Sequence, residues 1–265
     1  MRSWLRLTLA VAIALAAGAF AVGCGGGSSS SDTGTLTVGS DIPYPPFEEG
    51  QPPDYAGFDI DLVNAISDEI GRDVEYQDTE FDTIFRDLAQ GKFDMVASAT
   101  TITPEREQTV DFSDPYYLSE QAIVVTSDSD VKSVDDLDGL TVSVQQGTTG
   151  QAYVEDQTDA SEVRPFPTGP DAVNAAKAGT ADAAVLDLPV AQDAVAKESG
   201  LEIATSIPTD EEYGFVFQQD DDDLREEVND ALQKLKDDGT YAQIYKKWFK
   251  EEPPEEVLTA TNEPK

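Results

Sequence analysis

The residues that could do chemistry gather in one stretch, Ala97–Tyr117, where small hydroxyl side chains precede a single arginine. Ser98 and Thr101 are predicted to lie at the end of a strand, and Pro104 suits the first turn of a short helix. The guanidinium of Arg106 is well shaped to hold a carboxylate through two parallel hydrogen bonds. The stretch therefore predicts a carboxylate-binding site, although a helix start with capping hydroxyls and a solvated arginine gives the same pattern.

Composition excludes several other chemistries. Histidine is absent and Cys24 is the only cysteine, which excludes a histidine-based triad, base or metal site and a disulfide within the chain. We expect neither a metal nor a cofactor. The chain carries 17 basic and 53 acidic residues, a formal charge of −36, so nucleic acid is not an expected partner. Such a surface suits high salt, or it serves solubility alone.

The first 23 residues predict a signal peptide, because Arg2 and Arg6 precede an apolar, alanine-rich run that is short for a membrane span. Small residues followed by Cys24 resemble a lipoprotein signal, in which the cysteine is lipidated and becomes the new N-terminus. A simple secretory peptide with an incidental cysteine is the alternative. Residues 24–35 would then hold the lipid and a flexible Gly/Ser linker, and we expect an extracytoplasmic, membrane-anchored protein.

A unit of helix, glycine, aspartate and strand occurs twice, at 82–98 and 171–187. Two copies favour two related α/β lobes, although the pattern is common enough to arise by chance. Ligands collect at the carboxyl ends of strands in open α/β sheets, so the polar residues after each unit would face each other if the lobes do.

The organisation around these units follows from hydrophobic spacing. Apolar runs at 122–126 and 213–217 are predicted to cross between the lobes, and the tail after Glu251 is predicted to be disordered. The expected boundaries are 36–121 and 213–250 for the first lobe, 122–212 for the second, and 251–265 for an acidic tail. Helices are expected at 57–70, 81–90, 224–239 and 241–249, and strands at 35–39, 93–97 and 140–144.

Taken together, the motifs resemble the family 3 extracellular solute-binding proteins, the polar amino acid receptors of ABC importers. The resemblance runs from about residue 36 to 249. It rests on pieces in family order: VGSDIPYPPFE at 38–48, GFDIDLVNAI at 57–66, TITPERE at 101–107, VDFSDPYY at 110–117, DLDGLTVSVQQGTTG at 136–150, AGTADAAVLDLPVA at 178–191 and DGTYAQIYKKWF at 238–249. It implies a two-lobed periplasmic-binding-protein-like fold of type II, with two β hinge strands and a ligand cleft between the lobes. It also implies a monomer that delivers a free amino acid to membrane permease subunits.

The resemblance further implies a set of ligand-binding residues. The ligand α-carboxylate would be bound by Arg106, Thr101, Thr149 and the backbone of Ala99, and the α-ammonium by Asp187. Asp41 would touch the ligand side chain or its ammonium, and Gln145 would lie against the side chain. Tyr44 would stack on the ligand with Phe81 on the same wall, and Ser98 would be a small residue of the site. A neutral amide at Gln145 does not favour a charged side chain of either sign, whereas Asp41 supports a cation. We therefore expect a polar ligand that is uncharged or basic.

Two other classes of function share this fold in principle. One is an enzyme such as a periplasmic cyclohexadienyl or arogenate dehydratase, which needs a positioned acid or base. Without histidine, its candidates are carboxylates such as Asp41 and Asp187. The other is a sensor domain, which would need a separate signalling partner.

Overall fold

The computed structural model describes residues 34–262. The predicted signal peptide and Cys24 lie outside the described residues, as does most of the predicted linker. Within residues 34–262, no helix is long and apolar enough to cross a membrane.

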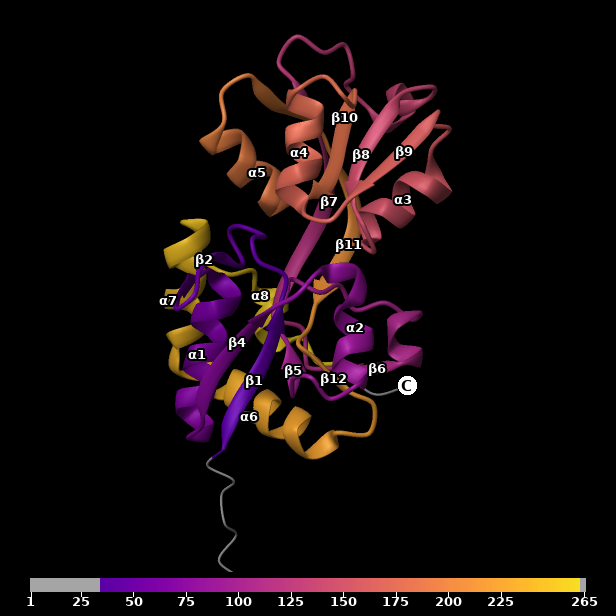
Figure 1. The fold of residues 1–265 in the computed structure, drawn as a ribbon. Helices are drawn as coiled ribbons and strands as arrows, with labels where there is room; N and C mark the ends of the chain where they lie inside the picture. Colours follow the sequence, from indigo (N-terminus) through magenta and orange to yellow (C-terminus); the bar gives the residue numbers. More distant parts are fainter. Residues whose placement is uncertain (1–33, 263–265) are drawn as a thin grey trace, which may run out of the picture. The chain divides into compact units, whose positions relative to one another are not determined.

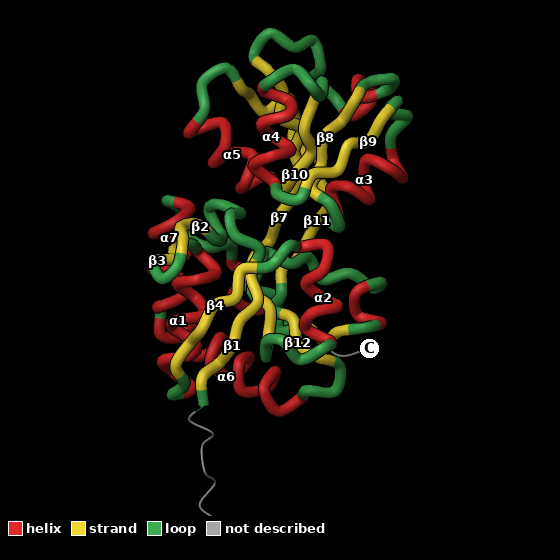
Figure 2. The backbone as a smooth tube through the Cα atoms, viewed as in Figure 1, coloured by secondary structure: helices red, strands yellow, loops and turns green. Residues whose placement is uncertain are grey.

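The described chain forms two five-stranded sheets and a small hairpin (Figures 1 and 2). We call the first sheet and its helices lobe 1, and the second sheet and its helices lobe 2. The sheet of lobe 1 runs β4 (Asp73–Asp78), β1 (Thr35–Ser40), β5 (Met95–Val96), β12 (Val216–Gln218) and β6 (Val110–Phe112). The sheet of lobe 2 runs β11 (Leu201–Tyr213), β7 (Tyr117–Thr126), β10 (Ala183–Asp187), β8 (Thr141–Gln145) and β9 (Glu162–Phe166). The hairpin pairs β2 (Glu49–Gln51) with β3 (Asp54–Ala56).

Helices pack against the sheets of both lobes, and the helices predicted from the sequence are among them. Lobe 1 contains α1 (Phe58–Ile70), α2 (Phe81–Ala89), α6 (Asp222–Asp238), α7 (Thr240–Phe249), α8 (Glu255–Thr259) and the 3₁₀ turn η1 (Arg106–Gln108). Lobe 2 contains α3 (Thr149–Gln157), α4 (Gly169–Lys177), α5 (Leu188–Lys197) and the 3₁₀ turn η2 (Val134–Leu137). Gly57 caps α1 at φ 144°, and a Cβ there would lie 1.8 Å from the carbonyl oxygen of Phe47, so only glycine fits.

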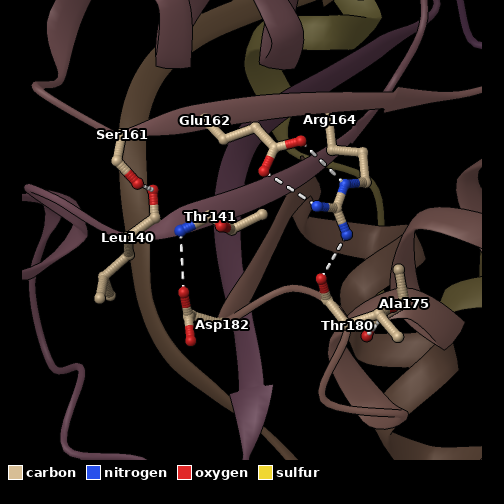
Figure 3. A network of polar contacts seen from close by, with 8 residues as sticks. All are labelled: Leu140, Thr141, Ser161, Glu162, Arg164, Ala175, Thr180 and Asp182. Atoms are coloured by element: carbon tan, nitrogen blue, oxygen red, sulfur yellow. Dashed lines mark hydrogen bonds and ion pairs between the residues drawn. The ribbon is translucent and has the colours of Figure 1, made fainter.

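The repeated unit is a true structural repeat. In lobe 1, Asp94 accepts a hydrogen bond from the N–H of Thr37 at 2.8 Å and returns its own N–H to the carbonyl of Thr37 at 2.9 Å. In lobe 2, Asp182 makes the same pair of bonds with Thr141, both at 2.8 Å. Figure 3 shows the one from the N–H of Thr141 to the carboxylate of Asp182. Each aspartate thus ties the start of one central strand to its parallel neighbour, β5 to β1 and β10 to β8.

Lobe 2 adds a local ion pair at the outer edge of this repeat (Figure 3). Arg164 on β9 binds the carboxylate of Glu162 with its Nε and Nη2 atoms and the carbonyl of Thr180 with Nη1. Ser161 donates to the carbonyl of Leu140 at 3.1 Å. These contacts fix the edge strand and the loop before β10, which carries Asp187 at its end.

Two long strands connect the lobes. β7 and β11 form an antiparallel ribbon that pairs Thr126 with Leu201 at one end and Tyr117 with Tyr213 at the other (Figure 1). The predicted crossing run 122–126 lies in β7. The second prediction, 213–217, is wrong: the crossing strand is β11, and Val216–Gln218 belongs to the sheet of lobe 1. β11 contains a proline and several acidic residues, so it lacks the apolar pattern of a buried strand. Its pairing with β7 stabilises it as a strand.

The acidic tail is ordered through residue 262, contrary to its predicted disorder. Residues Glu255–Thr259 form α8, and Val257 is fully buried in the lobe 1 core. The N–H of Asn262 donates to the carboxylate of Asp114 at 2.7 Å. Val257, with the partly buried Leu258 packed against the same core, anchors this segment, which an average over its charged composition does not reveal.

Candidate functional site

All ten sequence-predicted site residues, joined by Thr148, line one cavity. Lobe 1 contributes residues that follow β1 and β5 and the first residue of α2. Lobe 2 contributes the last residues of β8 and β10 and the start of α3. The lining residues are Asp41, Tyr44, Phe81, Ser98, Ala99, Thr101, Arg106, Gln145, Thr148, Thr149 and Asp187. The carboxyl ends of the strands of lobe 1 therefore face those of lobe 2, and strand ends of this kind are where ligands bind in open α/β sheets.

Arg106 provides a fixed positive charge at this cavity. Its Nη1 donates to the carbonyl of Thr101 at 2.7 Å and its Nη2 to the carbonyl of Gly147 at 3.2 Å. The guanidinium carbon lies 5.4 Å from the ring centroid of Phe81 and 5.1 Å from that of Phe85. Desolvation lowers the pKa of Arg106, while nearby carboxylates act in the opposite sense. An arginine side chain nevertheless stays charged, so this cation is available to an anionic group.

The N-terminus of α3 lies on the same side as Arg106, because Gly147, whose carbonyl accepts from Arg106, directly precedes the capping residue of α3. Thr148 caps the helix and accepts a hydrogen bond from the N–H of Gln151 at 3.2 Å. Thr149 is the first helical residue. Backbone N–H groups of a first turn have no partner within the helix and favour anions.

Asp187 provides a negative charge at the end of β10. Its Oδ2 accepts from the hydroxyl of Tyr44 at 2.7 Å and its Oδ1 from Nε2 of Gln121 at 2.5 Å. Only 6% of the residue is exposed, and this burial, with the nearby carboxylate of Glu211, raises the pKa of Asp187 to about 7. A cation placed beside Asp187 would therefore favour its ionised form.

Asp41 and Gln145 form another polar contact between the lobes. Nε2 of Gln145 donates to Oδ2 of Asp41 at 2.5 Å, and the N–H of Asp41 donates to the hydroxyl of Ser98 at 3.0 Å. Burial raises the pKa of Asp41 to about 7, and the hydrogen bond from Gln145 partly opposes that shift. This end of the cavity thus presents one acidic group and one amide.

Ala99 lines the cavity but does not offer the backbone donor expected of it. Its N–H donates to Oδ2 of Asp59 at 2.9 Å, and its φ of 43° lies in the left-handed region. The expectation that this N–H reaches a ligand carboxylate is therefore wrong for this structure. Asp59, which also accepts from the hydroxyl of Tyr116 at 2.7 Å, holds the strained turn in place.

Sequence reasoning missed two residues that organise the site. Gln121 on β7 is fully buried and Glu211 on β11 is 7% exposed. The amide of Gln121 donates to Asp187 and to Glu211, while Glu211 also accepts from Thr101 and Thr149. The available signals were a polar residue directly before the apolar run 122–125 of β7 and an acid two residues before Tyr213.

The chain matches the family described as bacterial extracellular solute-binding proteins, family 3, over residues 36–251. A curated relative, the ABC transporter arginine-binding protein 1 of Escherichia coli (strain K12), is 32% identical over 220 residues. That alignment covers 81% of this chain and 90% of the relative.

Solved structures agree with the sequence match. The arginine-, lysine-, histidine-binding protein ArtJ from Geobacillus stearothermophilus is 36% identical, with a TM-score of 0.80 over 84% of this chain and 99% of ArtJ. The ancestral amino acid-binding protein AncCDT-1, described as a precursor of cyclohexadienyl dehydratase, is 39% identical, with a TM-score of 0.75 over 81% of this chain and 95% of that chain. The predicted two-lobed α/β fold is thereby confirmed.

Proposed function

Because this chain belongs to the bacterial extracellular solute-binding proteins of family 3, we propose that it captures a free amino acid and delivers it to the permease of an ABC importer. One observation carries the proposal: a fixed cation, Arg106, and a fixed anion, Asp187, line the same cavity. A zwitterion needs one of each, and charge-assisted hydrogen bonds contribute roughly 1.5–3 kcal/mol apiece.

We assign the ligand carboxylate to Arg106 and to the N–H groups of Thr101 and Thr149. At the bridge between Thr101 and Tyr213, the bonds run from the N–H groups of Ile102 and Gly214, which turns the N–H of Thr101 away from that neighbour. Thr149 begins α3, so its N–H has no acceptor within the helix. These two N–H groups and the guanidinium would together surround one carboxylate.

We assign the ligand side chain to the end of the cavity formed by Asp41 and Gln145. Once Arg106 and Asp187 hold the main-chain charges, the acid of Asp41 remains for the ligand side chain, and it favours a cation or a hydrogen-bond donor. A basic or uncharged polar amino acid fits this end, whereas a carboxylate side chain would meet like charge. The names of the E. coli relative and of ArtJ support the basic choice.

An affinity series tests this assignment. Calorimetric titrations with arginine, lysine, glutamine and glutamate are expected to rank glutamate last. Asp41→Asn should narrow the preference for arginine over glutamine by about tenfold or more, since a charge-assisted bond is lost. Asp73→Asn, which changes an exposed acid of lobe 1, should leave the ranking intact. Glutamate or aspartate binding best would contradict the proposal.

Binding should strengthen as the pH rises from about 5 to 8. Burial raises the pKa of Asp187 and Asp41 to about 7 each, so at acidic pH both carboxyls are largely protonated. A ligand ammonium requires the carboxylate of Asp187, so binding must release protons below that pKa. Titrations in buffers of different ionisation enthalpy should show this release near pH 6 and its loss near pH 8; affinity that improves on acidification would contradict it.

We further propose that residues 1–23 are a signal peptide and that Cys24 is the lipid attachment point, placing the protein outside the cytoplasm as an anchored monomer. The Gly/Ser-rich segment that follows Cys24 supports a tether between anchor and lobes. Labelling with a fatty acid in a bacterial host, compared between the protein and Cys24→Ala, tests the anchor directly. Equal labelling of both would overturn it.

An enzyme on this fold remains the competing function, because AncCDT-1 is described as a dehydratase precursor. We favour binding because the two acids lining the cavity, Asp41 and Asp187, have amide or hydroxyl partners across the cleft that suit ligand recognition. Incubation with prephenate or arogenate is expected to give no aromatic product. Product formation that Asp187→Asn abolishes would establish the enzyme instead.

A further inference from the structure

We infer that Glu211 is a positioning residue for this binding site: its carboxylate orients the hydroxyls of Thr101 and Thr149 and, through Gln121, the ammonium-binding Asp187. The inference rests on the proposed function, because it deepens the account of how the same cleft recognises an amino acid. Glu211 itself is absent from the cavity lining, so it acts through its neighbours.

Four hydrogen bonds converge on this one carboxylate. Its Oε2 accepts from the hydroxyl of Thr101 at 2.6 Å and from that of Thr149 at 3.0 Å. Its Oε1 accepts from Nε2 of Gln121 at 2.9 Å and from the hydroxyl of Thr209 at 3.1 Å. Thr101 belongs to lobe 1, Thr149 to α3 of lobe 2, and the other two to β7 and β11. Glu211 therefore joins both lobes to both connecting strands.

The direction of these bonds decides what the cavity offers to a ligand. A threonine hydroxyl has one proton, and in Thr101 and Thr149 that proton points to Glu211. Neither hydroxyl can then donate to a ligand, so the donor role falls to the N–H groups of these two residues. The hydroxyl oxygen of Thr149 also accepts from Nε2 of Gln121 at 3.4 Å. Glu211 thus orients the groups that would bind the ligand carboxylate and, through Gln121, the one that would bind its ammonium.

Gln121 extends the effect to Asp187. The same Nε2 atom donates to Asp187 at 2.5 Å and to Glu211 at 2.9 Å, so the amide bridges the two acids. Rotating the amide would set its oxygen against both carboxylates. The amide oxygen instead faces Gly150 in the first turn of α3, where an added Cβ would lie 2.7 Å from it. Glycine at position 150 thus leaves room for the bridging amide.

Glu211→Gln tests the inference, because it keeps the shape of the side chain and replaces two acceptors with one acceptor and one donor. The best-bound amino acid should lose about 10- to 100-fold in affinity, the range expected for a charge-assisted bond. Its 2-oxo analogue, which lacks the ammonium, should lose distinctly less, because Asp187 matters little to it. Glu212→Gln is the matched control, since the neighbouring Glu212 is exposed; it should bind like the wild type.

Two further measurements keep the test decisive. Gly150→Ala, which displaces Gln121 without touching Glu211, should show the same selective loss if Glu211→Gln does not fold. In a double-mutant cycle, Glu211→Gln and Gln121→Leu should be strongly non-additive, because they act in one network. Equal losses for the amino acid and its 2-oxo analogue, or unchanged affinity in Glu211→Gln, would overturn the inference while leaving the proposed function intact. A wild-type protein that binds no amino acid would instead overturn both.

Discussion

Arg106→Ala is expected to weaken amino acid binding by about 2–5 kcal/mol, a loss that brings an ordinary receptor close to no detectable binding. The guanidinium is held by the carbonyls of Thr101 and Gly147 and by the rings of Phe81 and Phe85, so it is already oriented. Removing it leaves the ligand carboxylate without its cation in a partly desolvated cavity. The cost therefore exceeds that of an exposed ion pair, which contributes about 0–1 kcal/mol.

Two variants sharpen this test. Arg106→Lys keeps the charge but loses the planar fork, so its affinity should fall between the wild type and the alanine variant. Arg86→Ala removes an arginine of the same lobe whose side chain is 63% exposed and pairs with its neighbour Asp87, and this variant should bind normally. A calorimetric titration in which Arg106→Ala keeps wild-type affinity would remove Arg106 from the site.

Asp187→Asn should cost about 2–5 kcal/mol for ligands that carry an α-ammonium, because it removes the buried charge that pairs with it. The asparagine has the same shape, and its oxygen can still accept from Tyr44, so the fold should survive. The 2-oxo analogues, which have no ammonium to lose, should bind the variant and the wild type with similar affinity. Comparing the two ligand classes on one variant separates charge recognition from general damage.

A control for this variant lies on the next helix. Asp193 on α5 pairs with the exposed Lys197, and Asp193→Asn should leave both ligand classes unaffected. If Asp187→Asn weakened amino acids and 2-oxo acids equally, its assigned role with the ammonium would be contradicted.

Local patterns in the sequence anticipated much of this fold. The spacing of Phe58, Leu62 and Ile66 gave a helix whose apolar face is fully buried, and the two Gly–Asp units mark equivalent positions in the two sheets. Motif order then located residues distant in sequence, such as Arg106 and Asp187, around one cavity. Helix spacing and short motifs depend on residues that are near in sequence or shared across the family, so they can be recognised in a single sequence.

The features that the sequence did not reveal depend on tertiary contacts. β11 is stabilised by pairing with β7, and α8 is stabilised by burial of Val257. The spacing of apolar residues within either segment predicts neither contact. Gln121 and Glu211 look like ordinary polar residues until the lobes bring Thr101, Thr149 and Asp187 to them. The N–H of Ala99 is committed to Asp59, 40 residues away in sequence, which motif comparison alone could not show.

The most direct test of the central claim is thermal melting of the purified protein against the twenty amino acids, several polyamines and sugars, in low and in molar salt. A ligand at about 100 times its dissociation constant should add about 2.7 kcal/mol of stability and raise the melting temperature by several degrees. We predict a clear shift with basic or uncharged polar amino acids and none with sugars. A cooperative melt that no amino acid shifts in either salt condition would contradict the claim that this cleft captures an amino acid.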